Sequence, residues 1–413
     1  MTTSVTILGA GIVGICSALT LQRDGFAVTV IDRDDPGRGC SYGNAGILHT
    51  GGCVPLATPG ILTSVPGMLL DPDSALIIRW RHLPTLLPWL LRMLSASRRQ
   101  RVEEISQGMA ALSTAAKAAY LPWLKDAGAD DLLRTRGELY VYRSRAAFNA
   151  AHDDMRLRRA RGIPVEDLQG GAIRDMEPAL SHDFKFAHYQ PASAFVVNPF
   201  SLVQRLAALF VARGGHIQRA QVTDLRPRPG GGATLITTDA NLDAERFVLC
   251  TGAHSKPWAA RFGAQVPLES WRGYHIMVPH PRISLNGVVV DGDMHFAATP
   301  MDDGLRIAGL IELASVDAPP NYARADLFVK LGKGLMADFP DTPSSRWMGH
   351  RPGMPDTLPV IAPASAHPQV WFAFGHGMLG LTNGAITGEL VADMVSGRTP
   401  RIDLTPYRPE RFS

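Results

Sequence analysis

The stretch SVTILGAGIVG, residues 4–14, decides the fold of the N-terminal part of the chain. Its β-branched, apolar first half predicts a short strand over Ser4–Leu8, and the apolar spacing that follows predicts a helix from Gly11 to Arg23. Gly25 ends that helix, and a second buried strand is expected over Ala27–Ile31. This strand–helix–strand order predicts a parallel sheet with a right-handed crossover.

The glycines of this stretch form the pattern G-x-G-x-x-G at Gly9, Gly11 and Gly14. They permit a tight turn, a close approach of backbone to a pyrophosphate, and close packing of helix on strand. The N-terminus of the helix offers free N–H groups to the phosphate. Asp32 ends the second strand 21 residues after Gly11, where a carboxylate accepts hydrogen bonds from ribose hydroxyls. The pattern predicts a dinucleotide site, and Asp32 disfavours a 2′-phosphate, although Arg33 weakens that argument.

Composition and charge exclude several classes of protein. A chain of 413 residues with 46% hydrophobic and 19% charged residues can form two or three packed units. The net charge is +3, without a long basic run interleaved with aromatics, so no nucleic-acid partner is expected. Four cysteines without a CxxC pair predict neither a disulfide scaffold nor a metal site. With no signal peptide and no run of about 20 apolar residues, the expected location is the cytoplasm.

The rest of the chain mixes strands and helices. Prolines at 55, 59, 66, 72, 84 and 88 predict loop with short helices over 55–88. Further helices are expected at about Ile105–Lys125, Ala146–Arg161, Pro199–Arg213 and Tyr322–Phe339. Strands are expected at Glu138–Tyr142, Ala194–Val197, His216–Leu225, within Ala233–Ile311, and at Val370–Phe374, which precedes a glycine-rich turn and a helix through Val395.

Three later segments favour a flavin over a nicotinamide dinucleotide. Ser41–Leu48 is small and glycine-rich, so its backbone can run close to a flat ring. Val248–Ala253 is a buried strand with a tight turn, and Val370–Thr382 is a strand, a turn and a helix start. A second helix N-terminus suits the negative charge that a flavin gains on reduction. Each segment alone is also compatible with an ordinary turn; together they predict FAD. The residues expected to bind it are Gly9, Gly11, Ile12, Val13, Gly14, Asp32, Arg33, Ser41, Asn44, Ala45, Gly46, Ile47, Leu48, Val222, Thr251, Gly252, Ala253, Gly375, His376, Gly377, Met378, Leu379, Gly380, Leu381 and Thr382.

These motifs resemble the amino-acid-oxidising flavoproteins that include glycine oxidase, sarcosine oxidase and D-amino-acid oxidase. Within that family the chain is most similar to the bacterial D-amino-acid dehydrogenases. The closer resemblance rests on GNAGIL (43–48), Pro55, TPG (58–60), GHRPGMPD (349–356), LPVI (358–361) and YRPERF (407–412). It therefore runs from near residue 4 to residue 412.

The resemblance implies an α/β fold: a Rossmann-like FAD-binding domain with an inserted α+β substrate domain built on a mostly antiparallel sheet. The FAD-binding domain is expected to comprise residues 1–48, 146–180, 198–258 and 349–413. The substrate-binding domain is then expected to comprise residues 49–145, 181–197 and 259–348.

The resemblance also implies oxidation at the carbon that bears an amino group, with hydride passing to flavin N5. An imino acid leaves and hydrolyses to a 2-oxo acid. Arg351 matches the family's arginine for the substrate carboxylate, which a planar guanidinium can hold through both oxygens, or it forms a surface or structural ion pair. Tyr274 matches a second carboxylate or flavin contact, or it is a half-buried core tyrosine. His49 follows the flavin loop and either lines the substrate cavity or is structural, and His376 could contact the flavin.

Residues 75–101 depart from the simplest family members. Apolar and tryptophan side chains alternate there with Pro84 and Pro88, and the segment is edged by six arginines. Such a segment could rest on anionic lipid, which would suit a dehydrogenase that reduces a membrane quinone. A helix pair packed on the substrate domain, with a solvated basic face, explains the same pattern.

The sequence thus predicts an FAD-dependent dehydrogenase of D-amino acids, D-proline or hydroxy-D-proline included. Its expected partners are an amino-acid or imino-acid substrate and a quinone or respiratory-chain acceptor, with peripheral contact at the inner face of the membrane through 75–101 as an open option. The first alternative is an oxygen-using oxidase of glycine, sarcosine or another N-substituted amino acid. A flavin-bearing electron-transfer subunit of a larger complex and a plain NAD(P)-binding regulatory module are alternatives from other classes.

Overall fold

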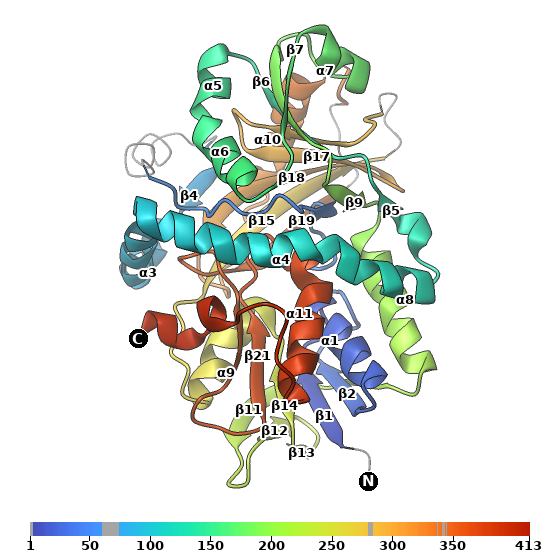
Figure 1. Ribbon diagram of the computed structural model, residues 1–413, viewed down its shortest axis with the longest axis vertical. Helices are drawn as coiled ribbons and strands as arrows, with labels where there is room; N and C mark the ends of the chain where they lie inside the picture. The colour runs from blue at the N-terminus through green and yellow to red at the C-terminus, as the bar shows by residue number, and fades with distance from the viewer. Residues whose placement is uncertain (1–2, 60–73, 280–283, 337, 341–342, 344) are drawn as a thin grey trace.

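Two large sheets organise the chain, as seen in a computed structural model that describes residues 3–59, 74–279, 284–336, 338–340, 343 and 345–413 (Figure 1). The first sheet has six strands in the order β10-β2-β1-β14-β21-β20. Five of them are parallel, and β20 is antiparallel to β21. The bounds are β1 Ser4–Leu8, β2 Ala27–Asp32, β10 His216–Arg219, β14 Phe247–Leu249, β20 Val360–Pro363 and β21 Val370–Phe374.

Helices α1 (Ile12–Arg23) and α11 (Gly380–Val395) pack together against this sheet, with α8 (Pro199–Ala212) beside α1 (Figure 1). Their contact is apolar: Ile15, Leu19, Ile386 and Leu390 are fully buried. Burial of each such side chain contributes roughly 1.5–3 kcal/mol. This core anchors the loops at the carboxyl ends of β1 and β21.

The second sheet has nine strands, in the order β19-β15-β18-β17-β16-β6-β8-β7 with β4 paired to β18. Most neighbours are antiparallel, while β6 with β16 and β4 with β18 are parallel. Helix α10 (Ala323–Leu335) packs on one face through Phe328 and Leu335. The bounds are β4 Leu76–Ile78, β6 Glu138–Tyr142, β7 Glu166–Gln169, β8 Phe186–Gln190, β15 Glu269–Val278, β16 Val288–Asp291, β17 Phe296–Met301, β18 Gly304–Leu313 and β19 Ser345–Gly353. The expected α/β fold with a mostly antiparallel second sheet is confirmed.

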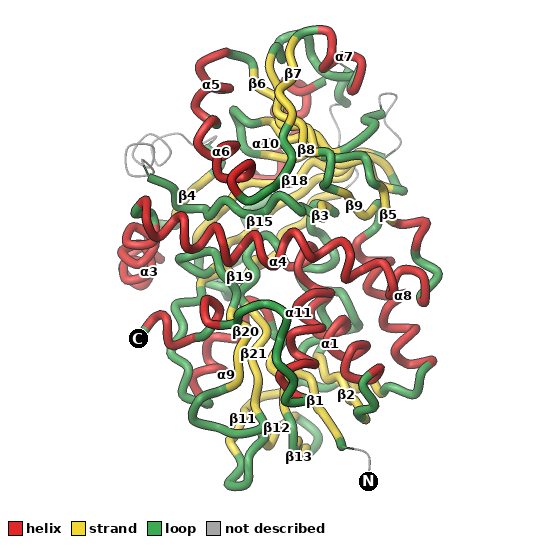
Figure 2. Tube along the Cα trace, viewed as in Figure 1, coloured by secondary structure: helices red, strands yellow, loops and turns green. Residues whose placement is uncertain are grey.

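The remaining elements connect or flank the two sheets (Figure 2). Helix α4 (Arg99–Asp126) crosses the middle of the molecule, and α3 (Leu83–Ala96) lies beside its start (Figure 1). The other bounds are β3 Ile47–Leu48, β5 Leu133–Arg134, β9 Ala194–Val196, β11 Val222–Pro227, β12 Ala233–Thr237, β13 Asn241–Ala244, α5 Arg145–Ala150, α6 His152–Ala160, α7 Gly171–Met176 and α9 Ser255–Arg261. No helix of the described residues is long and apolar enough to cross a membrane.

Several expected boundaries differ from the structure. The helix expected over Ala146–Arg161 is two helices, α5 and α6, separated at Ala151. The segment 146–180, expected with the FAD-binding half, contains β7, which pairs with β8 in the nine-stranded sheet. The boundary expected at residue 349 falls inside β19, because that strand continues its pairing with β15 through Gly353. Gly60, Pro66 and Pro72 lie outside the described residues.

Candidate active site

A continuous cavity of about 1390 Å³ lies between the two large sheets. On one side it is lined by the carboxyl ends of β1, β2, β14 and β21, and on the other by β17, β18 and β19. Open parallel sheets bind their ligands at the carboxyl ends of their strands. The cavity is therefore the candidate site for both a cofactor and a substrate.

The glycine loop after β1 is packed too tightly to carry side chains at two positions. A Cβ on Gly9, whose φ is +114°, would lie 2.4 Å from the Cys250 carbonyl oxygen, and one on Gly14 would lie 1.9 Å from the Gly9 oxygen. Asp32 Oδ2 accepts a hydrogen bond of 2.6 Å from the Ala10 N–H. The carboxylate of Asp32 is thus fixed beside the loop, and Asp32 and Arg33 both line the cavity.

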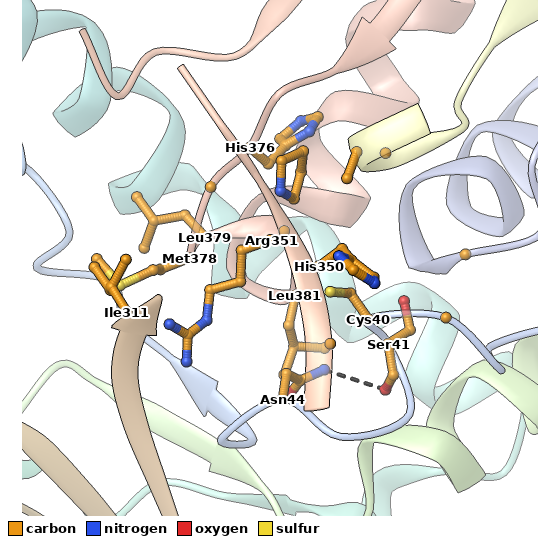
Figure 3. Close-up of a pocket in the computed structure, with 18 of the residues that line it drawn as sticks. Cys40, Ser41, Asn44, Ile311, His350, Arg351, His376, Met378, Leu379 and Leu381 are labelled. Atoms are coloured by element: carbon orange, nitrogen blue, oxygen red, sulfur yellow. Dashed lines mark hydrogen bonds between the residues drawn. The ribbon is translucent and has the colours of Figure 1, made fainter. Parts of the chain in front are cut away.

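The loop 41–48 is held from both halves of the molecule. Ser41 Oγ accepts from the Ile12 N–H at 3.0 Å, which ties the loop to the start of α1. Asn44 closes a local turn by donating to the Ser41 carbonyl (Figure 3). From the nine-stranded sheet, Arg306 donates to the Asn44 carbonyl at 2.7 Å, and His275 Nδ1 lies 2.8 Å from the Gly43 carbonyl oxygen. This support gives the cavity a rigid backbone wall.

The C-terminal turn and the start of α11 form the opposite wall. His376 Nε2 lies 2.9 Å from Thr387 Oγ1, and burial lowers the pKa of His376 to about 4. Its imidazole is therefore neutral near neutral pH. Thr382 Oγ1 accepts from the His49 N–H at 3.1 Å, which joins the first turn of α11 to the loop after β3.

The structure places most of the predicted cofactor residues around this cavity. Gly14, Gly46, Leu48 and Gly375 are not among the lining residues and pack behind them. The predicted residues that line the cavity are Gly9, Gly11, Ile12, Val13, Asp32, Arg33, Ser41, Asn44, Ala45, Ile47, Val222, Thr251, Gly252, Ala253, His376, Gly377, Met378, Leu379, Gly380, Leu381 and Thr382.

The cavity fits FAD. A fixed carboxylate, Asp32, lies next to a loop with no room for a side chain at Gly9 and Gly14 and next to the N-terminus of α1, as an adenosine diphosphate requires. The backbone of 41–47 and the N-terminus of α11 line a further part of the same cavity. These segments would hold the ring system, and the helix terminus would favour its negative charge on reduction.

Arg351 comes from β19 and lines the cavity (Figure 3). Its Nη1 donates to the Leu310 carbonyl at 2.7 Å, and its Nη2 donates to the Gly309 carbonyl at 3.1 Å. Leu310 has a φ of +56°, a conformation that costs a non-glycine residue roughly 1–3 kcal/mol. The two bonds use two of the five N–H groups of the guanidinium. They fix the fork of Arg351 in the cavity wall.

Tyr274 does not lie where the sequence suggested. It is not among the cavity-lining residues; its side chain is buried in the core of the nine-stranded sheet, with its hydroxyl 2.5 Å from Glu312 Oε2. The reason is the alternation of a strand, since its neighbour Gly273 faces Arg351 instead. A Cβ on Gly273 would lie 2.2 Å from Arg351 Cζ. Tyr274 therefore lies in the core of the sheet and not in the cavity wall.

His49 lines the cavity and is oriented by a carboxylate. Its Nδ1 lies 2.5 Å from Glu138 Oε2 at the start of β6. Burial alone would raise the pKa of Glu138, but His49 and Arg158 beside it lower that pKa below its usual value. Glu138 is thus an ionised group inside the cavity wall.

Sequence reasoning did not identify several residues of the site. Glu138 begins the strand expected over Glu138–Tyr142 and Arg158 lies in the helix expected over Ala146–Arg161, and neither pattern indicates a site residue. Gly273 carried no motif of its own. His350 precedes Arg351 in the motif GHRPG, which predicts no role for it. Its Nδ1 lies 2.8 Å from Ser270 Oγ, and burial lowers its pKa to about 4.

The FAD dependent oxidoreductase (DAO) family matches residues 4–394. A D-amino-acid oxidase from Bradyrhizobium diazoefficiens is 36% identical, over 99% of this chain and 98% of that protein. A D-amino acid dehydrogenase from Allorhizobium ampelinum is 31% identical, also over 99% and 98%.

Among solved structures, glycine oxidase from Geobacillus kaustophilus has the same fold, with a TM-score of 0.77 at 21% identity over 98% of both chains. The family match, the relatives and the cavity support FAD as the cofactor rather than the NAD(P) of a regulatory module. The chain belongs to the DAO family of FAD-dependent oxidoreductases.

Proposed function

We propose that this protein oxidises D-amino acids to imino acids, which hydrolyse to 2-oxo acids, and passes the electrons to a quinone-type acceptor. The relatives named as D-amino-acid oxidase and D-amino acid dehydrogenase support the substrate class. The observation that carries the proposal is the guanidinium of Arg351, held in the cavity wall by the carbonyls of Gly309 and Leu310.

The protein's part in this reaction is to bind and orient the substrate. The remaining N–H groups of Arg351 would hold the α-carboxylate through both oxygens, which fixes the α-carbon relative to the loop 41–47. Bound FAD supplies the hydride acceptor. A general base is not required if the amino group enters unprotonated.

The test is anaerobic mixing of the FAD-loaded protein with D- and L-amino acids, both proline series included, while the flavin absorbance is followed. We expect D-amino acids to bleach the flavin and their L-enantiomers to leave it oxidised. Arg351→Ala should raise KM for these substrates by at least tenfold, since a bidentate charged contact is lost. The variant should keep its FAD, because the carboxylate site and the glycine loop are separate parts of the cavity.

The outcomes separate the alternatives. Bleaching by glycine or sarcosine but not by larger D-amino acids would favour the oxidase alternative. Rapid reoxidation by air would assign oxygen as the acceptor, whereas slow reoxidation by air and fast reoxidation by a soluble quinone would support the dehydrogenase. If no amino acid of either hand bleaches the flavin, the proposal is wrong, and co-purifying chains would then favour an electron-transfer subunit.

We further propose that the surface of α3 rests on an anionic membrane. Trp80, Leu87 and Leu91 are 65%, 51% and 59% exposed. The same segment lines the cavity through Leu83, Leu90 and Leu94, so its apolar surface borders the site. The exposed arginines that flank it are Arg81, Arg92, Arg98, Arg99 and Arg101. Apolar side chains edged with arginine suit anionic headgroups, and they place the cavity near a lipid-soluble acceptor.

Sedimentation with vesicles tests this contact. We expect the protein to bind vesicles that contain phosphatidylglycerol and to bind phosphatidylcholine vesicles weakly. Leu87→Gln with Leu91→Gln should abolish the binding and leave flavin bleaching by D-amino acids unchanged. Val211, which is 50% exposed on α8, provides the control variant Val211→Gln. Equal binding by both variants would contradict the proposal.

A further inference from the structure

A second cationic side chain, Arg158 of α6, lines the same cavity as Arg351. Arg158 is 6% exposed. Its Nε and Nη1 are buried and have no hydrogen-bond partner within the described part of the chain. Buried donors without partners are costly and are normally satisfied by protein, water or a ligand. Arg158 therefore lines the cavity while two of its donors stay unpaired within the described part of the chain.

The surroundings of Arg158 are polar and lie at one end of the cavity. Its guanidinium lies 5.6 Å from the centre of the Tyr140 ring, and Glu138 and Asp154 act on it electrostatically without a direct ion pair. His49, Glu138, Tyr140, Asp154 and His295 line the cavity together with Arg158. We call these six residues the polar wall.

The nine-stranded sheet connects the polar wall to Arg351. Ala308, next to the Gly309 carbonyl that Arg351 holds, pairs with Ala297, which pairs with Val290, which pairs with Tyr140. All four residues of this row line the cavity. Three interstrand steps correspond to roughly 14 Å of backbone. A substrate held at Arg351 can thus extend its side chain over small residues toward the polar wall.

Resting on the function proposed above, we infer that Arg158 binds a neutral oxygen acceptor in the substrate's side chain, such as a carboxamide, hydroxyl or carbonyl oxygen. The charges of the polar wall decide between neutral and anionic groups. The positive charge of Arg158 already faces the ionised Glu138, and Asp154 adds negative charge when it is ionised. A substrate carboxylate would be repelled by both of these negative charges. A neutral oxygen acceptor is not repelled and can accept hydrogen bonds from Arg158.

Matched substrate pairs test this inference on the FAD-loaded protein. D-glutamine and D-methionine have similar length, and hydroxy-D-proline and D-proline share a ring, but one member of each pair lacks the side-chain oxygen. In the wild type we expect kcat/KM for flavin reduction to be at least tenfold higher for the oxygen-bearing member of one pair or both, as expected for a hydrogen bond to a charged group. D-glutamate should be a poorer substrate than D-glutamine.

Arg158→Met removes the donors while it keeps the bulk of the side chain. In this variant we expect the preference to fall to about twofold or less, and kcat/KM for D-alanine to fall less than that for the oxygen-bearing substrates, because its methyl group does not reach the polar wall. Arg158→Lys should retain part of the preference. Arg156, half-buried on the same helix and paired with Glu103 and Asp153, gives the control Arg156→Met, which should behave as wild type.

The outcomes test the inference about Arg158 separately from the proposed function. If D-alanine bleaches the flavin but neither pair shows a preference, or Arg158→Met keeps the preference, the inference fails and the proposed function stands. A preference for D-glutamate over D-glutamine would overturn the neutral acceptor. Absence of bleaching by every D-amino acid would overturn both proposals.

Discussion

At the scale of single residues, the position of Arg351 depends on a neighbour that has no side chain. Gly273 lies directly beneath Arg351, and a Cβ there would lie 2.2 Å from both Cζ and Nη2 of the guanidinium. Contacts below 3 Å force one partner to move, and the flexible arginine moves more easily than the strand. Gly273 thus sets the position of Arg351 without touching a ligand.

Gly273→Ala should therefore weaken substrate binding without loss of the cofactor. We expect KM for D-amino acids to rise by roughly tenfold, because the guanidinium leaves the Gly309 and Leu310 carbonyls. A displaced guanidinium no longer holds both oxygens of the substrate carboxylate in the required geometry. Steady-state kinetics and the flavin content of the purified protein measure the two effects. Gly171→Ala, where nothing lies within 4 Å of the added Cβ, is the control. An unchanged KM in Gly273→Ala would show that Arg351 tolerates the displacement.

At the scale of elements, the strands and helices with strong local patterns were predictable. β1, α1 and β21 follow the sequence to within a residue, because an apolar period and a glycine stop mark each of them. The start of α4, six residues before the expected helix, carries polar and charged residues that give no apolar period. The break between α5 and α6 could not be predicted, because no glycine or proline lies there.

The loops that carry the predicted cofactor residues could be identified from the sequence, whereas other residues at the cavity could not. Glycine-rich turns after strands carry a local signal, so residues 9–14, 41–48 and 375–382 could be predicted from the sequence when they are taken together. Glu138, Arg158 and Gly273 meet the cavity only through the pairing of strands far apart in sequence. The orientation of Tyr274 depends on the register of β15, and one residue changes the face of a strand. Strand register across the nine-stranded sheet was not readable from local patterns.

At the scale of the whole molecule, two buried histidines, His275 and His376, and the partly buried His350 lie where the two halves meet around the cavity. Burial lowers the pKa of His275 to about 3 and those of His350 and His376 to about 4. His275 contacts the Gly43 carbonyl across the halves, and His376 contacts Thr387 in α11. All three are neutral in the folded protein near neutral pH.

Acid should therefore destabilise the fold through these histidines. Between about pH 4 and 6.5 the unfolded chain binds more protons than the folded one at each of them, so their stabilising contribution is full above pH 6.5 and decreases as the pH falls toward the folded pKa values. The slope is at most about 1.4 kcal/mol per pH unit for each histidine. Glu177 acts in the opposite sense, because burial raises its pKa to about 7.

Replacing one histidine separates its contribution to the pH dependence of the free energy of unfolding from the contributions of the other groups. His376→Gln keeps a group that can bond Thr387 but cannot take up a proton, so the free energy of unfolding should fall less steeply with acid than in the wild type. We expect a difference of about 1 kcal/mol per pH unit between pH 4.5 and 6. Urea unfolding of the FAD-saturated proteins at several pH values measures it. His216→Gln, at an exposed position on β10, is the control and should follow the wild-type slope. Equal slopes for His376→Gln and the wild type would mean that His376 takes up its proton as easily in the folded protein as in the unfolded chain.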